Sequence, residues 1–145
     1  MPRALVVVDP EPRVKELLDV ASDFARGSGA QLLLFHVTDT FDSSAVREQM
    51  RDLTGVDHNY RSGIEGAEEF ASDLGEELLA DDVDFAVEGA FGETAQRIVA
   101  AVEEFDCTHV FLTGRRRSPT GKAVFGDTAQ EVLLNVDVPV TLVME

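Results

Sequence analysis

The sequence predicts an α/β fold: one Rossmann-like domain over residues 1–145, with an open five-stranded parallel sheet and helices on both faces. Three observations predict it. Strand-like and helix-like segments alternate along the whole chain. The strand-like segments are short, continuous apolar runs, as expected of strands buried on both faces. The helix-like segments carry apolar residues at helical spacing.

The first three elements are the clearest. Ala4–Val8 is a valine-rich apolar run and predicts the first strand. Glu11–Arg26 predicts a helix with one apolar stripe, and Gly27 and Gly29 end it. Gln31–Val37 predicts the second strand. The stripe consists of Val14, Leu17, Leu18, Ala21, Phe24 and Ala25.

The segment Thr38–Tyr60 is polar, with a weak helical phase through Val46, Met50 and Leu53, and we expect a lid or excursion there. The rest of the chain returns to the alternation. The expected elements are a helix from about Arg61 to Ala80, a strand Val83–Val87, a helix Glu93–Phe105, a strand Thr108–Thr113, a helix Thr128–Val136 and a last strand Val138–Val143.

Right-handed crossovers limit how these five strands can be ordered, and we expect the order 3-2-1-4-5. The sheet then grows one way from strand one to strand three, and strand four returns to lie beside strand one. Ligands of open parallel sheets bind outside the carboxyl ends, where the order reverses. The Asp9-Pro10 turn and the loop that starts at Gly114 follow those two strands, so we expect them to line a ligand crevice.

The strongly negative net charge indicates which partners the protein can bind and in what salt concentration it works. The net charge is -16, with 28 acidic residues, 10 arginines and only 2 lysines. A nucleic-acid binder would show a basic face, so we expect no nucleic-acid partner. We interpret the acidity as adaptation to a salt-rich cytoplasm, as in halophilic archaea, because carboxylates barely repel at molar salt, where the Debye length is about 3 Å. The alternative is an ordinary acidic protein.

The sequence favours a cytoplasmic protein without a membrane segment. No apolar run approaches the roughly 18 residues of a membrane span, and the N-terminus lacks the pattern of a signal peptide. The single cysteine, Cys107, excludes an internal disulfide and fits a reducing compartment. Cys107 stands where a strand should begin, without a histidine tied to it by a motif, so we do not expect it to be a nucleophile.

A basic run stands out against this acidity. Arg115–Arg117 and Lys122 lie within eight positions, between Gly114 and Gly126. The run follows an expected strand and precedes an expected helix, and nucleotide phosphates commonly dock at such a junction on free backbone N–H groups. We therefore expect an anion site here. The alternative is that these arginines are exposed and paired with surface carboxylates.

The chain resembles the universal stress protein family over nearly its whole length. The resemblance rests on Val6-Val7-Val8-Asp9, His36-Val37, Val87-Glu88-Gly89, Leu112-Thr113-Gly114 through Gly126, and Val138-Pro139-Val140-Thr141-Leu142-Val143. It implies the same five-stranded sheet and a homodimer through the final strand, Val138–Val143. An edge strand of this kind also favours pairing with a second copy.

The ATP-binding branch of the family carries a glycine, two residues, a glycine, nine residues, then a glycine followed by serine or threonine. Gly114 matches the first glycine, whereas Arg117 stands in place of the second. Eight residues, not nine, separate Arg117 from Gly126, and Asp127 replaces the hydroxyl residue. Arginines can offset that carboxylate, because each can donate charge-assisted hydrogen bonds to phosphate.

Two of the expected site residues each have a second explanation. By resemblance, Asp9 would accept hydrogen bonds from ribose or adenine; the alternative is a turn residue that caps the first helix. Val37 resembles the position against which the family's adenine packs, and core packing is the alternative. The full set of expected site residues is Asp9, Pro10, Val37, Thr113, Gly114, Arg115, Arg117, Gly121, Lys122, Gly126, Asp127 and Thr128.

Asp127 separates two hypotheses about the last helix. Asp127-x-x-Gln130 and Thr128-x-x-Glu131 both resemble capping boxes. If Asp127 caps the helix, it occupies the N–H groups that a phosphate would use. If Thr128 caps instead, Asp127 would face a metal-bridged phosphate. Residues 126–130 resemble residues 92–96, and we interpret both as the same pattern of helix start.

The sequence therefore predicts a cytoplasmic stress-response module that binds a nucleotide or another phosphate-bearing anion. ATP or another adenine nucleotide, with Mg²⁺, is the cofactor that the resemblance suggests. The alternative is a dimeric interaction protein of the same fold without a nucleotide. Slow ATP hydrolysis is a third hypothesis, but no nucleophile–base set or acid–base pair has the required spacing. His58 and His109 lack partners at zinc-ligand spacing, so no catalytic or metal residue is assigned.

Overall fold

The computed structural model of the chain describes residues 2–38, 44–55, 63–114 and 126–144. They form a five-stranded parallel sheet in the order β3-β2-β1-β4-β5, which confirms the predicted fold class and strand order. The strands are β1 (Arg3–Val7), β2 (Gln31–Thr38), β3 (Phe85–Phe91), β4 (His109–Gly114) and β5 (Val140–Met144). The helices are α1 (Val14–Ser28), α2 (Ser44–Thr54), α3 (Gly63–Leu78), α4 (Thr94–Glu104) and α5 (Asp127–Asn135).

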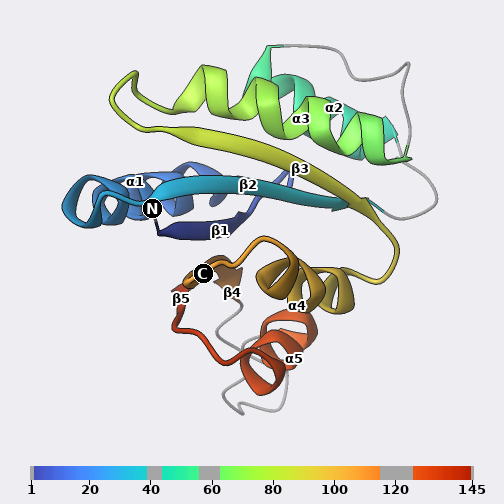
Figure 1. The fold of residues 1–145 in the computed structure, drawn as a ribbon. Coiled ribbons are helices and arrows are strands. Elements are labelled where there is room, and N and C mark those ends of the chain that lie inside the picture. Colours follow the sequence, from blue (N-terminus) through green and yellow to red (C-terminus); the bar gives the residue numbers. More distant parts are fainter. Residues whose placement is uncertain (1, 39–43, 56–62, 115–125, 145) are drawn as a thin grey trace.

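Helices cover both faces of the sheet, as predicted (Figure 1). α1, α2 and α3 pack on one face, and α4 and α5 pack on the other. Residues of β1 alternate between the two cores: Ala4 and Val6 face the first, whereas Leu5 and Val7 face the second. A strand buried on both faces must be apolar at every position, which explains the continuous apolar run in the sequence.

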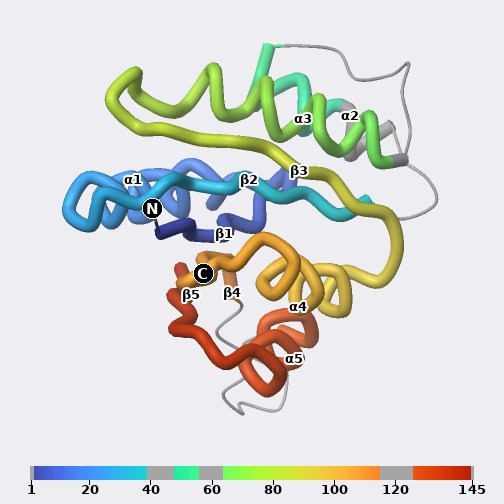
Figure 2. Tube along the Cα trace, in the orientation of Figure 1, coloured from blue at the N-terminus to red at the C-terminus, as the bar shows by residue number. Residues whose placement is uncertain are grey.

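The strand order reverses at β1. Leu5 pairs with Leu33 of β2 on one side and with Val110 of β4 on the other. The chain runs outward from β1 to β3, then returns through α4 to place β4 beside β1 (Figure 2). Because all five strands are parallel, their carboxyl ends lie at one edge of the sheet, which we call the carboxyl edge.

The first helix starts later than predicted. α1 begins at Val14 rather than Glu11, because the backbone turns before the helix: the Glu11 N–H donates to the Asp9 carbonyl and the Val14 N–H to the Glu11 carbonyl. The helix continues through Gly27 to Ser28, two residues beyond the predicted end, and of the two glycines expected to end it only Gly29 does so. Gly29 adopts φ +75°, and its N–H donates to the carbonyl of Ala25.

The third strand also differs from its prediction. β3 covers Phe85–Phe91 instead of Val83–Val87, because the Val83 N–H donates to Ala80 in a turn that buries Val83 before the strand begins. Within the segment expected to be a lid or excursion, the weak helical phase corresponds to α2, and Met50 is buried against the first core. The other elements shift by one or two residues at most of their ends.

Gly89 in β3 lets α3 approach the sheet closely. A Cβ at this position would lie 2.7 Å from the Ile64 carbonyl oxygen and 2.9 Å from both the Ala67 Cβ and the Glu68 nitrogen. Two of these neighbours are backbone atoms of α3, which cannot rotate away as a side chain could. Glycine is therefore required here by helix–sheet packing rather than by backbone conformation.

Gly89→Ala should destabilise the protein by about 1–3 kcal/mol, because α3 must move away from β3 to admit the methyl group. Gly27→Ala is the matched control, since a Cβ there meets nothing within 4 Å, and it should be neutral or stabilising by up to about 1 kcal/mol. Urea unfolding of the two variants measures the difference. Equal stability of the two variants would contradict the close packing of α3 on Gly89.

Candidate functional site at the carboxyl edge

The sheet brings the predicted residues of β1, β2 and β4 into one row. Val7 pairs with Phe35, and Val6 pairs with Phe111. Continuing this register past the ends of the ladders places Asp9 level with Val37 and Gly114. The three predicted residues therefore lie together where the strand order reverses, which is where open parallel sheets bind their ligands.

Of the remaining predicted residues, the structure describes Pro10 directly after Asp9, Thr113 directly before Gly114, and Gly126, Asp127 and Thr128 at the start of α5. Arg115, Arg117, Gly121 and Lys122 lie outside the described residues, and so does the rest of the basic run. The prediction that this run forms an anion site, and its alternative of surface ion pairs, both stay untested.

The backbone of Asp9 is held on both sides. The Val8 N–H donates to the carbonyl of Phe35 at 2.9 Å, and the Asp9 carbonyl accepts from the Glu11 N–H at 2.8 Å. Pro10 lies between Asp9 and Glu11, and its ring fixes the backbone angle φ. The N-cap of α1 is Arg13, so the alternative in which Asp9 caps this helix is wrong. The Asp9 side chain, 45% exposed, is left to face the carboxyl edge.

His36 is the neighbour of Asp9 that the site prediction did not include. Its imidazole is buried near the end of β2. Nδ1 lies 2.7 Å from the Val8 carbonyl oxygen and 3.6 Å from Asp9 Oδ1, and the ring packs edge-on against Phe70. The sequence contains no periodic signal for this contact, because it joins the ends of two strands 28 positions apart.

Val37 lies in the core between the sheet and α4/α5, where it is 7% exposed. Core packing, the alternative considered for this residue, therefore accounts for its side chain. Its position in the row beside Asp9 leaves the predicted contact with adenine as an untested prediction.

The two similar helix starts are capped differently. In α4 the N-cap is Glu93, whose carboxylate accepts hydrogen bonds from the N–H groups of Ala95 (3.3 Å) and Gln96 (2.8 Å). In α5 the N-cap is one position earlier in the shared pattern, at Gly126, which has no side chain. The hydrogen bonds from Arg97 N–H to the Glu93 carbonyl and from Gln130 N–H to the Gly126 carbonyl fix both assignments.

Both capping predictions for α5 are therefore wrong. Asp127 and Thr128 lie inside the first turn rather than at the N-cap. Gly126 has φ +93° and ψ 152°, a conformation that favours glycine over residues with a Cβ. Because the N-cap is a glycine, no N-cap side chain accepts the first-turn amides of α5, and the exposed Asp127 carboxylate lies within that first turn.

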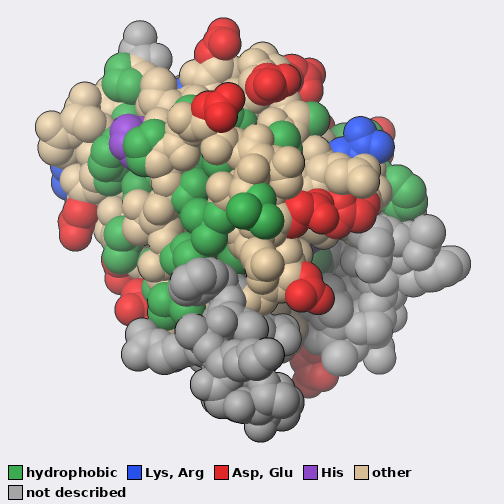
Figure 3. Space-filling model, turned by 90° about the horizontal axis from the view of Figure 1, so that it is seen from below, with side chains coloured by type: hydrophobic (Ala, Val, Ile, Leu, Met, Phe, Trp, Pro, Cys, Tyr) green, Lys and Arg blue, Asp and Glu red, His purple; other side chains and the backbone are tan. Residues whose placement is uncertain are grey.

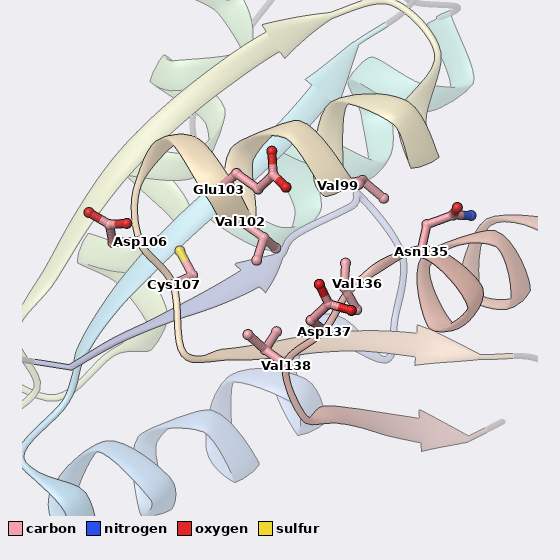
Figure 4. A pocket seen from close by; sticks show the side chains of 9 residues that line it. All are labelled: Val99, Val102, Glu103, Asp106, Cys107, Asn135, Val136, Asp137 and Val138. Atoms are coloured by element: carbon pink, nitrogen blue, oxygen red, sulfur yellow. The ribbon is translucent and has the colours of Figure 1, made fainter.

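A cavity of about 250 Å³ lies away from this site, at the amino edge of β4 and β5 (Figure 4). Figure 4 shows that its lining comes from the end of α4, the connection to β4, and the connection from α5 to β5. Valines and the Cys107 thiol line it together with three carboxylates, from Glu103, Asp106 and Asp137. None of the predicted site residues contributes to it.

Cys107 is buried in this lining, and burial raises the pKa of its thiol to about 11. Desolvation disfavours the thiolate, which is the nucleophilic form. The thiol environment thus agrees with the prediction that Cys107 is not a nucleophile. In the described part of the chain, no three His, Cys, Asp or Glu side chains are arranged to hold a metal ion. No helix there is long and apolar enough to cross a membrane.

Cys107 should react slowly with an aromatic disulfide reagent at pH 8. Relative to a thiol of ordinary pKa, a thiol with a pKa near 11 has about a hundredfold less thiolate at this pH. The same protein unfolded in urea is the control and should react rapidly. Native labelling as fast as that of the unfolded chain would contradict the buried position.

Comparison with known proteins agrees with this architecture. The family model of the universal stress protein family matches residues 1–144. Among curated proteins, none matches the chain. A universal stress protein from Archaeoglobus fulgidus is similar in structure, with a TM-score of 0.65 and 23% identity over 98% of this chain and 97% of the other.

Two further solved structures carry nucleotides. One is a universal stress protein from Archaeoglobus fulgidus in complex with dAMP, with a TM-score of 0.61 and 17% identity over 98% of this chain and 96% of the other. Another is a universal stress protein family protein from Arabidopsis thaliana with AMP bound, with a TM-score of 0.60 and 15% identity over 100% and 92% of the two chains. With the family model matching almost every residue, this chain belongs to the universal stress protein family.

Proposed function

We propose that this protein is a cytoplasmic stress-response module that binds an adenine nucleotide at the carboxyl edge, between β1 and β4. The observation that carries the proposal is the open start of α5, where Gly126 leaves the first-turn amides without a side-chain cap. Structures of this fold with dAMP or AMP bound support an adenine nucleotide as the ligand class.

The start of α5 supplies the phosphate end of the proposed site. A helix N-terminus carries about half a positive charge and presents unpaired N–H groups. A glycine at the N-cap also lets a phosphate approach the backbone without meeting a Cβ. α4 starts at the same edge, but the Glu93 carboxylate already accepts hydrogen bonds from its first-turn amides. We therefore assign the phosphates to α5 alone.

Asp127 requires a countercharge in this proposal. Its carboxylate lies in the first turn of α5, where it repels a phosphate at the same helix end. Arg115, Arg117 and Lys122 belong to the loop that leads into this helix, and they provide cations in the sequence for that role. Mg²⁺ bridging Asp127 and a phosphate oxygen is the second source of positive charge that we propose.

The nucleoside end of the proposed site lies along the row of Asp9, Val37 and Gly114. The half-exposed Asp9 carboxylate is the acceptor for ribose hydroxyl or adenine amino groups. Gly114, buried at the end of β4, and the neighbouring Thr113 lead from this row toward the loop of basic residues. The proposed ligand thus spans the reversal of strand order, with its phosphates at α5.

Calorimetry with ATP, ADP and AMP, with and without Mg²⁺ at high KCl, should detect binding to the wild-type protein. Arg115→Ala combined with Arg117→Ala should weaken binding by about a hundredfold or more, because each of the two lost charge-assisted hydrogen bonds costs about 1.5–3 kcal/mol. Arg3→Ala with Arg26→Ala is the control that removes equal charge at the opposite edge. Unchanged affinity in the first pair would remove the basic loop from the site, and no binding by the wild type would overturn the proposed function.

We also propose a homodimer that forms through β5. The same dimer is expected under the alternative function, that of an interaction protein which binds no nucleotide. β5 is an edge strand, and Leu134 of the adjoining α5 is 76% exposed. Hydrophobic side chains gather in the middle of the face that carries α5 (Figure 3). A second copy that pairs with β5 would cover both the unpaired backbone edge and apolar surface.

Thr141→Glu in β5 and Leu134→Glu in α5 should each shift the protein toward a monomer, because a desolvated carboxylate at the interface is unfavourable. Light scattering coupled to size-exclusion chromatography measures the mass. Ile64→Glu is the matched control, since Ile64 is exposed on α3, on the opposite face of the sheet. A wild-type monomer at all concentrations, or two variants that remain dimeric, would contradict the proposal.

We also propose that the protein is of the haloarchaeal type. Many of its acidic side chains are exposed on the helices, such as Glu16, Asp19 and Asp23 of α1. Mutual repulsion of these carboxylates opposes the compact state at low salt. Screening reduces that repulsion as the Debye length falls from about 10 Å at 0.1 M to about 3 Å at 1 M.

The melting temperature should therefore rise steadily with KCl up to molar concentrations. Sucrose is the control, because it stabilises folded proteins by exclusion from the surface without screening charge. Thermal melts in KCl and in sucrose at low salt separate the two effects. A melting temperature that stays constant or falls with KCl would contradict the adaptation.

A further inference from the structure

We propose that His36 is a positioning residue for ligand binding: through Nδ1–H it holds the end of β1 and orients the Asp9 carboxylate that meets the nucleoside. The inference rests on the proposed function and deepens it, since it names a residue that acts on the ligand only through its neighbour. Three observations carry it, concerning the tautomer of His36, the carbonyl of Val8 and the environment of Asp9.

The tautomer of His36 follows from its partner. Nδ1 lies 2.7 Å from the Val8 carbonyl oxygen, and a carbonyl oxygen only accepts hydrogen bonds. The proton of the neutral imidazole therefore sits on Nδ1. The ring is 5% exposed and packs edge-on against Phe70 at 5.0 Å, so it has little room to flip.

The carbonyl of Val8 needs this donor. The regular ladder of β1 ends at Val7, and Val8 is fully buried one residue beyond it. A buried carbonyl that lacks a donor is costly, and among the described residues His36 is the donor it receives. The imidazole thus extends the hydrogen bonding of the sheet by one residue, up to the peptide that carries Asp9.

The Asp9 carboxylate lies beside the same N–H group. Asp9 Oδ1 is 3.6 Å from Nδ1, a distance too long for a direct hydrogen bond but short enough for the N–H dipole to attract the charge. No described lysine or arginine forms an ion pair with this carboxylate. The N–H group of His36 therefore attracts Oδ1 of Asp9 and restrains the carboxylate. The exposed part of the carboxylate keeps lone pairs for the hydroxyl or amino donors of a ligand.

His36→Asn and His36→Gln both keep a hydrogen-bond donor but place it differently. Comparing them shows whether the position of the donor matters or only its presence. The amide nitrogen of asparagine is attached to Cγ, as Nδ1 is in histidine, whereas that of glutamine lies one atom further out. His36→Asn should keep AMP affinity within about threefold of the wild type. His36→Gln should lower it by about tenfold, because the displaced donor no longer bonds the Val8 carbonyl and the backbone that carries Asp9 loses its support.

The control variant is His109→Phe. His109 also packs on an aromatic ring, that of Phe24 at 4.3 Å, but it lies at the amino end of β4. It should leave AMP affinity unchanged. Thermal melts of all variants identify any that fail to fold, and His36→Asn keeps the test valid if His36→Gln does not fold.

A double-mutant cycle with Asp9→Ala tests whether His36 acts through Asp9. In the Asp9→Ala background, His36→Gln should cause no further loss of AMP affinity. A full additional loss there, or equal affinity of the Gln, Asn and wild-type proteins, would overturn the positioning role alone. Binding of inorganic pyrophosphate, which lacks a nucleoside, should be the same in every His36 variant.

Nitrogen NMR of the unliganded protein gives a readout that does not depend on any nucleotide. The His36 signals should show a proton on Nδ1, and the Nδ1 shift should move in Asp9→Asn but not in an Asp127→Asn control. A proton on Nε2 would overturn the inference even if nucleotides bind. Failure of the wild type to bind AMP and pyrophosphate would instead overturn the proposed function, and the ligand role of His36 with it.

Discussion

The central constraint in this protein is the burial of β1 between two strands and two layers of helices. From Ala4 to Val7 its side chains are almost completely excluded from solvent on both faces, and its backbone pairs with β2 and β4. Fully burying each valine or leucine contributes about 1.5–3 kcal/mol, so the strand cannot be moved outward without a large loss. The reversal of strand order, and with it the position of the candidate site, follows from this strand being central.

The end of β1 shows how that constraint reaches the site. The Val8 carbonyl at the end of the strand is buried and needs a hydrogen-bond donor, which His36 supplies. The chain then turns tightly through Pro10, where the Glu11 N–H donates to the Asp9 carbonyl. These hydrogen bonds hold the backbone from which the Asp9 side chain extends at the carboxyl edge. At the end of β1, the hydrogen bonds that stabilise the core therefore also hold the backbone of the candidate site.

The starts of α4 and α5 differ although their sequences are alike. Glu93 closes one helix with its own carboxylate, whereas Gly126 leaves the other open, with Asp127 inside the first turn. The difference lies in the backbone that enters each helix: Glu93 has an extended conformation with φ -77°, and Gly126 has φ +93°. A single shift of the cap along the pattern replaces a carboxylate cap by a glycine without a side chain.

The sequence by itself determined the fold class and the strand order, because burial on both faces and right-handed crossovers leave few arrangements. That order also predicted that Asp9 and Gly114 follow neighbouring strands, whereas Val37 was predicted only from the resemblance to the family. It also located most elements to within one or two residues, although the start of β3 was misplaced because a buried valine in a turn looks like a strand. Only the tertiary structure decided the N-cap of α5, the close contact at Gly89 and the contact of His36 with Val8. The reason is physical: each depends on backbone conformation or on distances between residues far apart in the chain, and local composition does not encode either.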